Sequence, residues 1–97
     1  MPTNHIVLVT FKPKLESLED FGTLMASVKA DLPSAEGCNR VRVLRSVEQP
    51  PAFVLIEDWE SKDLHAAYVA GLVETGAWAK VEAMLTEPPA SAILDEF

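Results

Sequence analysis

Two short runs of consecutive large apolar residues, at positions 6–9 and 53–56, constrain the fold of this chain more than any other feature. Each run lies in a segment rich in β-branched and aromatic residues, 5–11 and 52–59, which is typical of a β-strand. Because successive side chains of a strand point to opposite faces of its sheet, each strand sends large aliphatic side chains to both faces. A fold for this chain must therefore cover both faces of a sheet.

The segment after the first strand has the periodicity of an amphipathic helix. Its apolar residues recur at alternating three- and four-residue spacing: Leu18, Phe21, Met25, Val28 and Leu32. That spacing places them on one continuous stripe of a helix. Ser17, with Asp20 three residues later, is a candidate N-cap with a short capping box, and Pro33 is expected to end the helix.

The rest of the chain is predicted to form two further strands and a second, interrupted helix. Gly37 marks a turn before a strand over residues 38–47, and a last, edge-like strand is expected over residues 90–97. Ser61 is a good N-cap for a helix that is expected to break near residues 71–76 and then resume. The apolar faces of these two helical stretches carry Leu64, Tyr68 and Leu72, then Trp78, Val81 and Leu85. The residues predicted to be core include Phe21, Met25, Trp78 and Met84.

This order of elements, β-α-β-β-α(α)-β, predicts an α+β fold of the ferredoxin-like type, a four-stranded antiparallel sheet with its helices on one face. The chain is expected to form a single domain, residues 1–97. Helices on one face leave the other face open, and half of each apolar run lies there. A patch of that kind is uncommon on a soluble monomer. We therefore expect a homodimer in which two sheets pack face to face, a dimeric α/β barrel.

The charge and cysteine content narrow the range of partners. The chain carries 8 Lys and Arg against 15 Asp and Glu, a net charge of −7, which argues against nucleic acid or an anionic membrane surface as a partner. No stretch approaches the ~18 apolar residues that span a bilayer, and no signal-peptide pattern is present. The single Cys38 excludes an internal disulfide and any zinc site built from several cysteines. These features predict a cytoplasmic protein.

Several segments carry a family resemblance. Gly37-Cys38 opens the expected second strand, Val43-Leu-Arg-Ser-Val47 closes it, and Phe53-Val-Leu-Ile-Glu-Asp-Trp-Glu-Ser61 runs from the third strand into the next helix. Together with Pro88-Pro89 before the last strand, these segments resemble the antibiotic biosynthesis monooxygenase (ABM) family of the dimeric α/β-barrel group. Residues 5–12 also look like the first strand of the stress-responsive sister group. The resemblance implies the ferredoxin-like fold and the dimer.

The chain departs from the family pattern at three places. Family members often carry a histidine nine residues after the Trp of this motif, where this chain has Tyr68. Some members that oxygenate anthrones have Asn four residues before that Trp, where this chain has Leu55, which becomes a candidate substrate contact. Haem-degrading relatives use an axial histidine after the second helix, but this stretch has Trp78 and no histidine. Haem degradation is therefore not expected.

Glu57 and Trp59 lie two residues apart on the expected third strand, so both project from the same face. In anthrone-oxygenating relatives a Trp at this point lines the pocket, which implies that the Trp59 indole holds a phenol or carbonyl oxygen of a substrate. The alternative for Trp59 is an apolar plug between sheet and helix. Burial would raise the pKa of Glu57 and make it a general acid or base. Its alternative is an ion pair with Arg40 or Arg42.

His65 precedes Tyr68 by three residues on the expected second helix, so their side chains are neighbours. A histidine that titrates near neutrality can take the proton of a substrate hydroxyl, with Tyr68 orienting the substrate. The alternative is a partly exposed histidine without a role. His5, at the start of the first strand, has no suitably spaced carboxylate partner, and no metal site is predicted.

No phosphate-binding glycine loop, Rossmann fingerprint, nucleophile elbow or flavin motif occurs, so no cofactor is expected. The resemblance implies a cofactor-independent monooxygenase that uses O₂ on an electron-rich aromatic substrate, such as a quinol or an anthrone. His65 and Glu57 are the candidate catalytic residues, and Trp59, Tyr68 and Leu55 are the candidate substrate contacts. Two alternatives stay open. One is a non-enzymatic small-ligand-binding protein of the stress-responsive type, and the other is a cofactor-free isomerase or cyclase.

Overall fold

The computed structural model describes residues 4–97, and its strands form one sheet. The strands are β1 (His5–Phe11), β2 (Cys38–Arg45), β3 (Phe53–Trp59) and β4 (Ala90–Leu94). Their order in the sheet is β2-β3-β1-β4, and every neighbouring pair is antiparallel. The predicted α+β class and its four-stranded antiparallel sheet are therefore confirmed.

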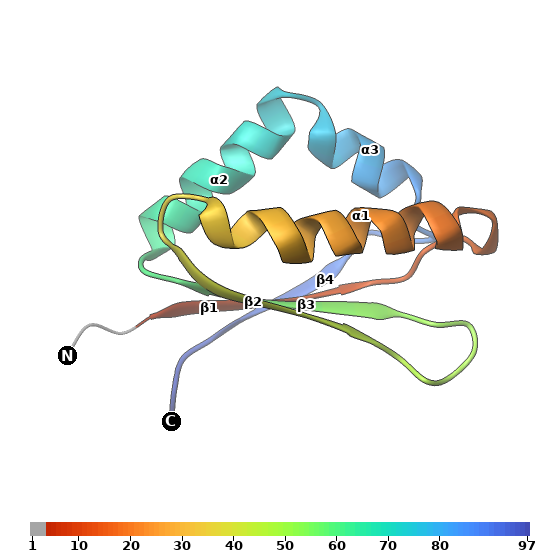
Figure 1. Ribbon diagram of the computed structural model, residues 1–97, viewed down its shortest axis with the longest axis horizontal. Helices are drawn as coiled ribbons and strands as arrows, with labels where there is room; N and C mark the ends of the chain where they lie inside the picture. Colours follow the sequence, from red (N-terminus) through yellow and green to blue (C-terminus); the bar gives the residue numbers. More distant parts are fainter. Residues whose placement is uncertain (1–3) are drawn as a thin grey trace.

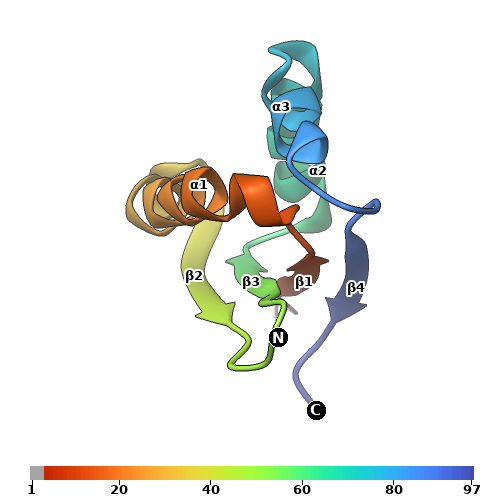
Figure 2. The same ribbon diagram turned by 90° about the vertical axis from the view of Figure 1, so that its right-hand side faces the viewer.

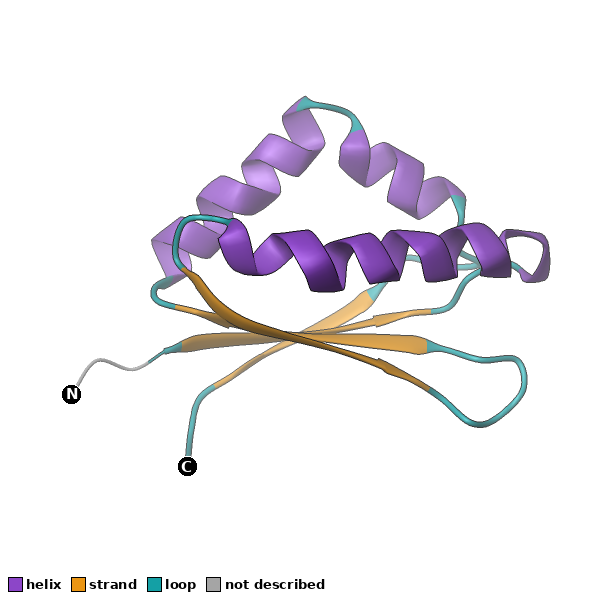
Figure 3. Ribbon diagram, viewed as in Figure 1, coloured by secondary structure: helices purple, strands orange, loops and turns teal. Residues whose placement is uncertain are grey.

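Three α-helices lie on one face of this sheet (Figures 1 and 3): α1 (Leu18–Asp31), α2 (Lys62–Glu74) and α3 (Ala77–Ala83). Short 3₁₀ turns flank α1, at Leu15–Ser17 and Leu32–Ser34. In Figure 2, α1 stands over the β2 side of the sheet, while α2 and α3 stand apart from it over the side of β1 and β4. The helix layer is thus divided into two parts, with the sheet beneath both.

The starts and breaks of the helices only partly follow the predictions. Ser61 caps α2 as predicted, because its Oγ accepts a hydrogen bond from the Leu64 N–H at 3.2 Å. Ser17 precedes α1, but its side chain makes no capping hydrogen bond, so the predicted capping box is wrong. Gly71 remains inside α2, and the break comes at Gly76, whose left-handed φ of 82° lets α3 start in a new direction.

Three strands are shorter than predicted. β2 ends at Arg45 rather than at position 47, β3 begins at Phe53 rather than at 52, and β4 ends at Leu94 rather than at 97. The Ser46 N–H donates to the Ala52 carbonyl at 2.8 Å, which closes the connection between β2 and β3. Strand pairing therefore ends where this turn begins.

The two faces of the sheet have different surroundings. The residues of β1 and β3 that are buried beneath the helices are Val7, Phe11, Phe53, Leu55, Glu57 and Trp59. The intervening residues on the opposite face include the half-buried Ile6, Leu8, Val54 and Ile56. Leu44 of β2 and Leu94 of β4 are each 42% exposed. The apolar outer face that the sequence predicts is present.

Packing holds α1 to the sheet more closely than α2 and α3. Phe21 of α1 is fully buried, and its ring centroid lies 5.3 Å from those of Phe11 and of Phe53. A second buried cluster surrounds Trp59 and includes Leu32. By contrast, no residue of α2 or α3 is fully buried. Space therefore remains between these two helices, α1 and the sheet.

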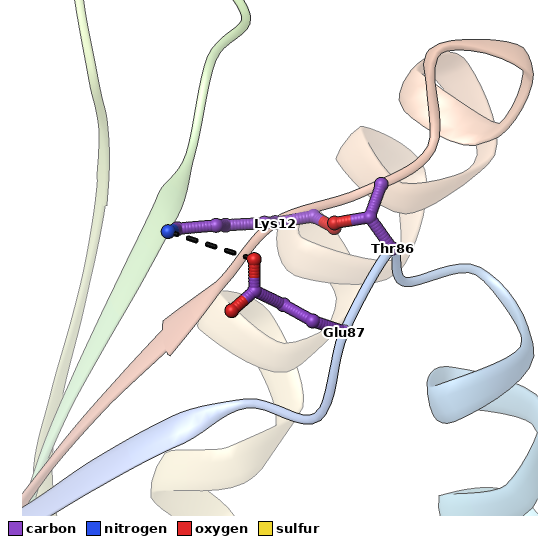
Figure 4. Close-up of polar contacts among 3 residues, drawn as sticks. All are labelled: Lys12, Thr86 and Glu87. Atoms are coloured by element: carbon purple, nitrogen blue, oxygen red, sulfur yellow. Dashed lines mark hydrogen bonds and ion pairs between the residues drawn. The ribbon is translucent and has the colours of Figure 1, made fainter.

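The end of α3 is tied to the end of β1 (Figure 4). Both the N–H and the Oγ1 of Thr86 donate to the Lys12 carbonyl, at 2.9 and 3.1 Å, and the Lys14 N–H donates to the Met84 carbonyl at 2.8 Å. The Lys12 Nζ also lies 3.7 Å from the Glu87 carboxylate. Because exposed ion pairs contribute little to stability, the hydrogen bonds to the Lys12 and Met84 carbonyls do most to hold the end of α3 in place. From this point the chain returns as β4 beside β1.

Candidate active site

A cavity of about 440 Å³ lies between the helices and the sheet. Its walls are mainly aliphatic and aromatic side chains from all three helices and from β1, β3 and β4. Besides the Trp78 indole, the polar side chains of the lining are Glu57, His65, Tyr68 and Ser91. The volume falls within the ~300–1,000 Å³ of typical small-molecule sites. The cavity can therefore take a small, largely apolar molecule and present it to a few polar groups.

Glu57 supplies the only carboxylate of the cavity lining. It is 5% exposed, and its Oε1 accepts a hydrogen bond from the Trp59 indole N–H at 2.8 Å. Burial raises the pKa of Glu57, and the bond from Trp59 offsets part of that rise. An ion pair with Arg40 or Arg42, the alternative for this carboxylate, is not formed. Val41 is the residue of β2 opposite Glu57, so the two arginines lie on the other face of the sheet.

Trp59 is fully buried behind this carboxylate and does not line the cavity. Its ring centroid lies 5.3 Å from that of His65 and 5.3 Å from that of Tyr68. Because its N–H is donated to Glu57, the indole acts on the cavity through that residue. Leu55, two residues earlier on β3, does line the cavity.

His65 and Tyr68, whose three-residue spacing predicts neighbouring side chains on α2, both line the cavity. Burial lowers the pKa of His65, and the nearby His5 lowers it further. Burial also raises the pKa of Tyr68, with smaller contributions from the charges of Glu57 and Cys38. At pH 7 the imidazole is therefore neutral and can accept a proton, while the phenol keeps its proton and can donate a hydrogen bond.

Two of the residues whose spacing predicts a core position also border the cavity. Met25 of α1 is buried in the core, as predicted, and Trp78 of α3 packs against that core; both line the cavity as well. His5, for which the sequence predicts no role, has its ring centroid 5.3 Å from that of His65. The pairing of β1 with β3 sets His5 opposite Trp59. This register is a tertiary property, and no local signal in the sequence gives it.

Metal ligation and membrane insertion find no support in the described part of the chain. Within residues 4–97, no group of three or more His, Cys, Asp or Glu side chains is arranged to hold a metal ion. Cys38 is buried and free, and burial raises the pKa of its thiol. None of the helices in this range is long and apolar enough to cross a bilayer.

These features define a ferredoxin-like α+β protein with a small-molecule cavity between its sheet and its helices. The sequence profile of the antibiotic biosynthesis monooxygenase family matches residues 4–71, more than half of the chain, and the chain belongs to this family. The matched segment contains Glu57, His65 and Tyr68. Comparison with curated protein sequences gives no significant match. The family resemblance drawn from the sequence is thus confirmed.

Solved structures share the fold over nearly their whole length. A protein from Mycobacterium tuberculosis is 19% identical, with a TM-score of 0.83 over 97% of this chain and 95% of that chain. A candidate antibiotic biosynthesis monooxygenase from Nitrosomonas europaea is 20% identical, with a TM-score of 0.85 over 100% and 93%. Another from Bordetella bronchiseptica is 24% identical, with a TM-score of 0.78 over 98% of both chains. At these identities the likeness establishes the common fold.

Proposed function

We propose that this chain is a cofactor-independent monooxygenase that uses O₂ on an electron-rich aromatic substrate, such as a quinol or an anthrone. The observation that carries the proposal is a largely apolar cavity whose lining holds one carboxyl, one imidazole and one phenol. An apolar wall suits a flat aromatic ring, and three polar groups suffice to orient its oxygen and remove a proton. Membership of the ABM family supports the same reaction class.

In this proposal the polar residues have separate roles. His65 takes the proton of the bound substrate, because its lowered pKa leaves the imidazole neutral at pH 7. Tyr68, which keeps its proton, donates a hydrogen bond to the substrate oxygen. Glu57 is a reserve base, and Trp59 positions its carboxylate through the 2.8 Å hydrogen bond. Leu55 contacts the substrate ring from the floor of the cavity.

The proposed reaction needs no external reductant. A deprotonated anthrone transfers one electron to O₂, and the resulting radical and superoxide join through a new C–O bond. The peroxide anion then loses hydroxide, which turns the CH₂ carbon into a carbonyl. One atom of O₂ enters the product, and the other leaves as hydroxide with the second hydrogen of that carbon; the first hydrogen, removed as a proton at the start, neutralises this hydroxide to water. The substrate supplies all four electrons that reduce O₂, while the protein orients the ring and excludes water.

The test is oxygen uptake by the purified protein with anthrone, corrected for the autoxidation of anthrone alone. We expect a rate above that background, incorporation of one atom from ¹⁸O₂, and loss of the rate in His65→Phe. Asp63→Ala, an exposed position on the same helix, is the matched control and should keep the rate. Binding without turnover would indicate a ligand-binding protein instead. Conversion without oxygen would indicate an isomerase or cyclase.

We also infer that two copies pair through the outer face of the sheet. That face carries the half-buried aliphatic residues Ile6, Leu8, Val54 and Ile56, and no helix within residues 4–97 covers it. The Asp58 Oδ1 on the same face is buried and has no hydrogen-bond partner in the described chain. A second copy would cover the aliphatic residues and could provide a donor for this oxygen.

A further inference from the structure

Two histidines from distant parts of the chain meet at one end of the cavity. His5 begins β1 and His65 lies near the start of α2, and their ring centroids are 5.3 Å apart with the planes tilted by 38°. They are the only two histidines in the sequence. The ring of His65 also lies 5.3 Å from that of Trp59, which is fully buried. The imidazole pair therefore lies between the sheet and the first turns of α2.

The two imidazoles face different spaces. His65 lines the apolar cavity, whereas His5 lines a separate depression on the outside of the molecule. Both side chains are half-buried. Ile93 of β4 borders both spaces. The pair thus lies between the cavity, which His65 lines, and the outer depression, which His5 lines.

We propose that His65 and His5 form a relay that carries the proton of the substrate from the cavity to solvent. The relay rests on the proposed oxygenase function, which supplies the proton. His65 accepts this proton at one ring nitrogen and releases the proton of its other nitrogen to His5. His5 then passes a proton to water in the outer depression in the same way. Each step moves one proton, and both rings end neutral, because an imidazole can accept at one nitrogen and donate at the other.

On the cavity side of the relay, the surroundings of His65 disfavour a lasting positive charge on its imidazole. The other titratable side chains of the cavity lining are Glu57 and Tyr68. Burial lowers the pKa of His65, so an imidazolium formed there is readily lost. A positive charge on His5 disfavours a second one on His65, so protons pass one at a time.

The solvent side of the relay is suited to receive the proton. The charged residues that border the outer depression together with His5 are Glu60, Lys62 and Asp95. Two carboxylates against one ammonium give this rim a net charge of −1, which attracts a proton from the cavity side toward the rim. The electrostatic gradient along the pair therefore points from the apolar cavity to the acidic, solvated rim.

The test variant is His5→Phe, which keeps an aromatic ring against His65 and removes the nitrogens that carry protons. With anthrone as substrate, we expect kcat to fall by about tenfold or more while KM is unchanged. Added imidazole should restore turnover in His5→Phe but not in His65→Phe, which lacks the first acceptor. An unchanged kcat in His5→Phe, or a loss that imidazole does not reverse, overturns the relay.

A second measurement does not depend on turnover. NMR of ¹⁵N-labelled imidazoles follows both the pKa of His65 and the exchange of its ring proton with water. In His5→Phe we expect slower exchange and a higher pKa for His65, because the exit and the neighbouring charge are both removed. Unchanged exchange overturns the relay, whatever the oxygen uptake. A wild-type protein that consumes no oxygen with anthrone overturns the proposed function, and the exchange result alone then decides the relay.

Discussion

At the scale of single residues, Glu57 is the group whose ionisation matters most to stability. Burial raises its pKa above the ordinary value of 4.5. The folded chain therefore holds this proton more tightly than the unfolded chain, and the stabilisation is lost as the pH rises from about 4.5 through the folded pKa. Glu57→Gln stays neutral at every pH. We expect this variant to gain stability relative to wild type as the pH rises.

Urea unfolding of wild type and Glu57→Gln at pH 5 and pH 8 measures this effect. The difference between their free energies of unfolding should be larger in favour of the variant at pH 8. The other titratable side chains are the same in both proteins, so their contributions cancel in the comparison. An equal difference at the two pH values would contradict a raised pKa for Glu57.

The indole of Trp59 gives a second prediction at this scale. Trp59→Phe removes the only hydrogen bond of the buried Glu57 side chain within residues 4–97. Leaving a buried acceptor without its donor costs about 1–3 kcal/mol, so we expect a loss of stability of that size in chemical unfolding. Trp78→Phe is the matched control, because the Trp78 indole makes no hydrogen bond in the same range of the chain. Equal losses in the two variants would show that ring volume, not the hydrogen bond, is the cause.

Sequence reasoning at the residue scale identified candidates but not their contacts. The two-residue spacing of Glu57 and Trp59 predicts a shared face, and the three-residue spacing of His65 and Tyr68 predicts neighbours, because both follow from the period of one element. The bond from Trp59 to Glu57 and the approach of His5 to His65 depend on rotamers and on strand register. Those are tertiary properties that no local spacing encodes.

At the scale of elements, Gly37 fixes how α2 sits on the start of β2. Its φ is +85°, and a Cβ added there would lie 2.5 Å from the Leu64 Cδ1 and 2.7 Å from the Leu64 Cβ. The Gly37 carbonyl also accepts a hydrogen bond from the Glu60 N–H at 2.7 Å. A side chain at this position must therefore push the first turn of α2 away from the sheet.

We expect Gly37→Ala to lower the free energy of unfolding by about 1–3 kcal/mol, the cost of overpacking, as measured by urea unfolding. The matched control is Gly22→Ala in α1, where an added Cβ meets nothing within 4 Å. That change should stabilise the helix by roughly 0.5–1 kcal/mol. A Gly37→Ala protein as stable as wild type would show that α2 can shift freely against β2.

The elements themselves were predictable because each has a strong local pattern. The helical stripe over residues 18–32 and the run of apolar, β-branched and aromatic residues over 52–59 predicted α1 and the central strand β3 to within a few residues. The ends of β2 and β4 were not predictable, because pairing with a neighbouring strand, rather than propensity, decides where a strand stops. Whether the space under the second helix is open could not be predicted, since Trp78 and Met25 have the spacing of core residues and yet border the cavity.

At the scale of the whole molecule, the proposed dimer can be tested at Ile56. This residue lies on the outer face of β3, opposite Leu8 and Arg42 in the neighbouring strands. Burying an unpaired charge costs about 3–5 kcal/mol, so Ile56→Arg should weaken association by about a hundredfold or more. Sedimentation velocity at micromolar concentration measures this. Val73→Arg, at a 59% exposed position of α2, is the control and should leave the dimer intact. A monomeric wild-type protein would contradict the pairing.

Both tryptophans of the chain lie at or next to the cavity. Trp78 forms part of the cavity wall, and Trp59 lies behind it in contact with the carboxylate of Glu57. The intrinsic fluorescence of the protein therefore comes entirely from the surroundings of the cavity. An aromatic compound that enters should quench the Trp78 emission, while ionisation of the nearby carboxyl should shift that of Trp59. Occupancy and protonation can then be followed separately in single-tryptophan variants, without any added dye.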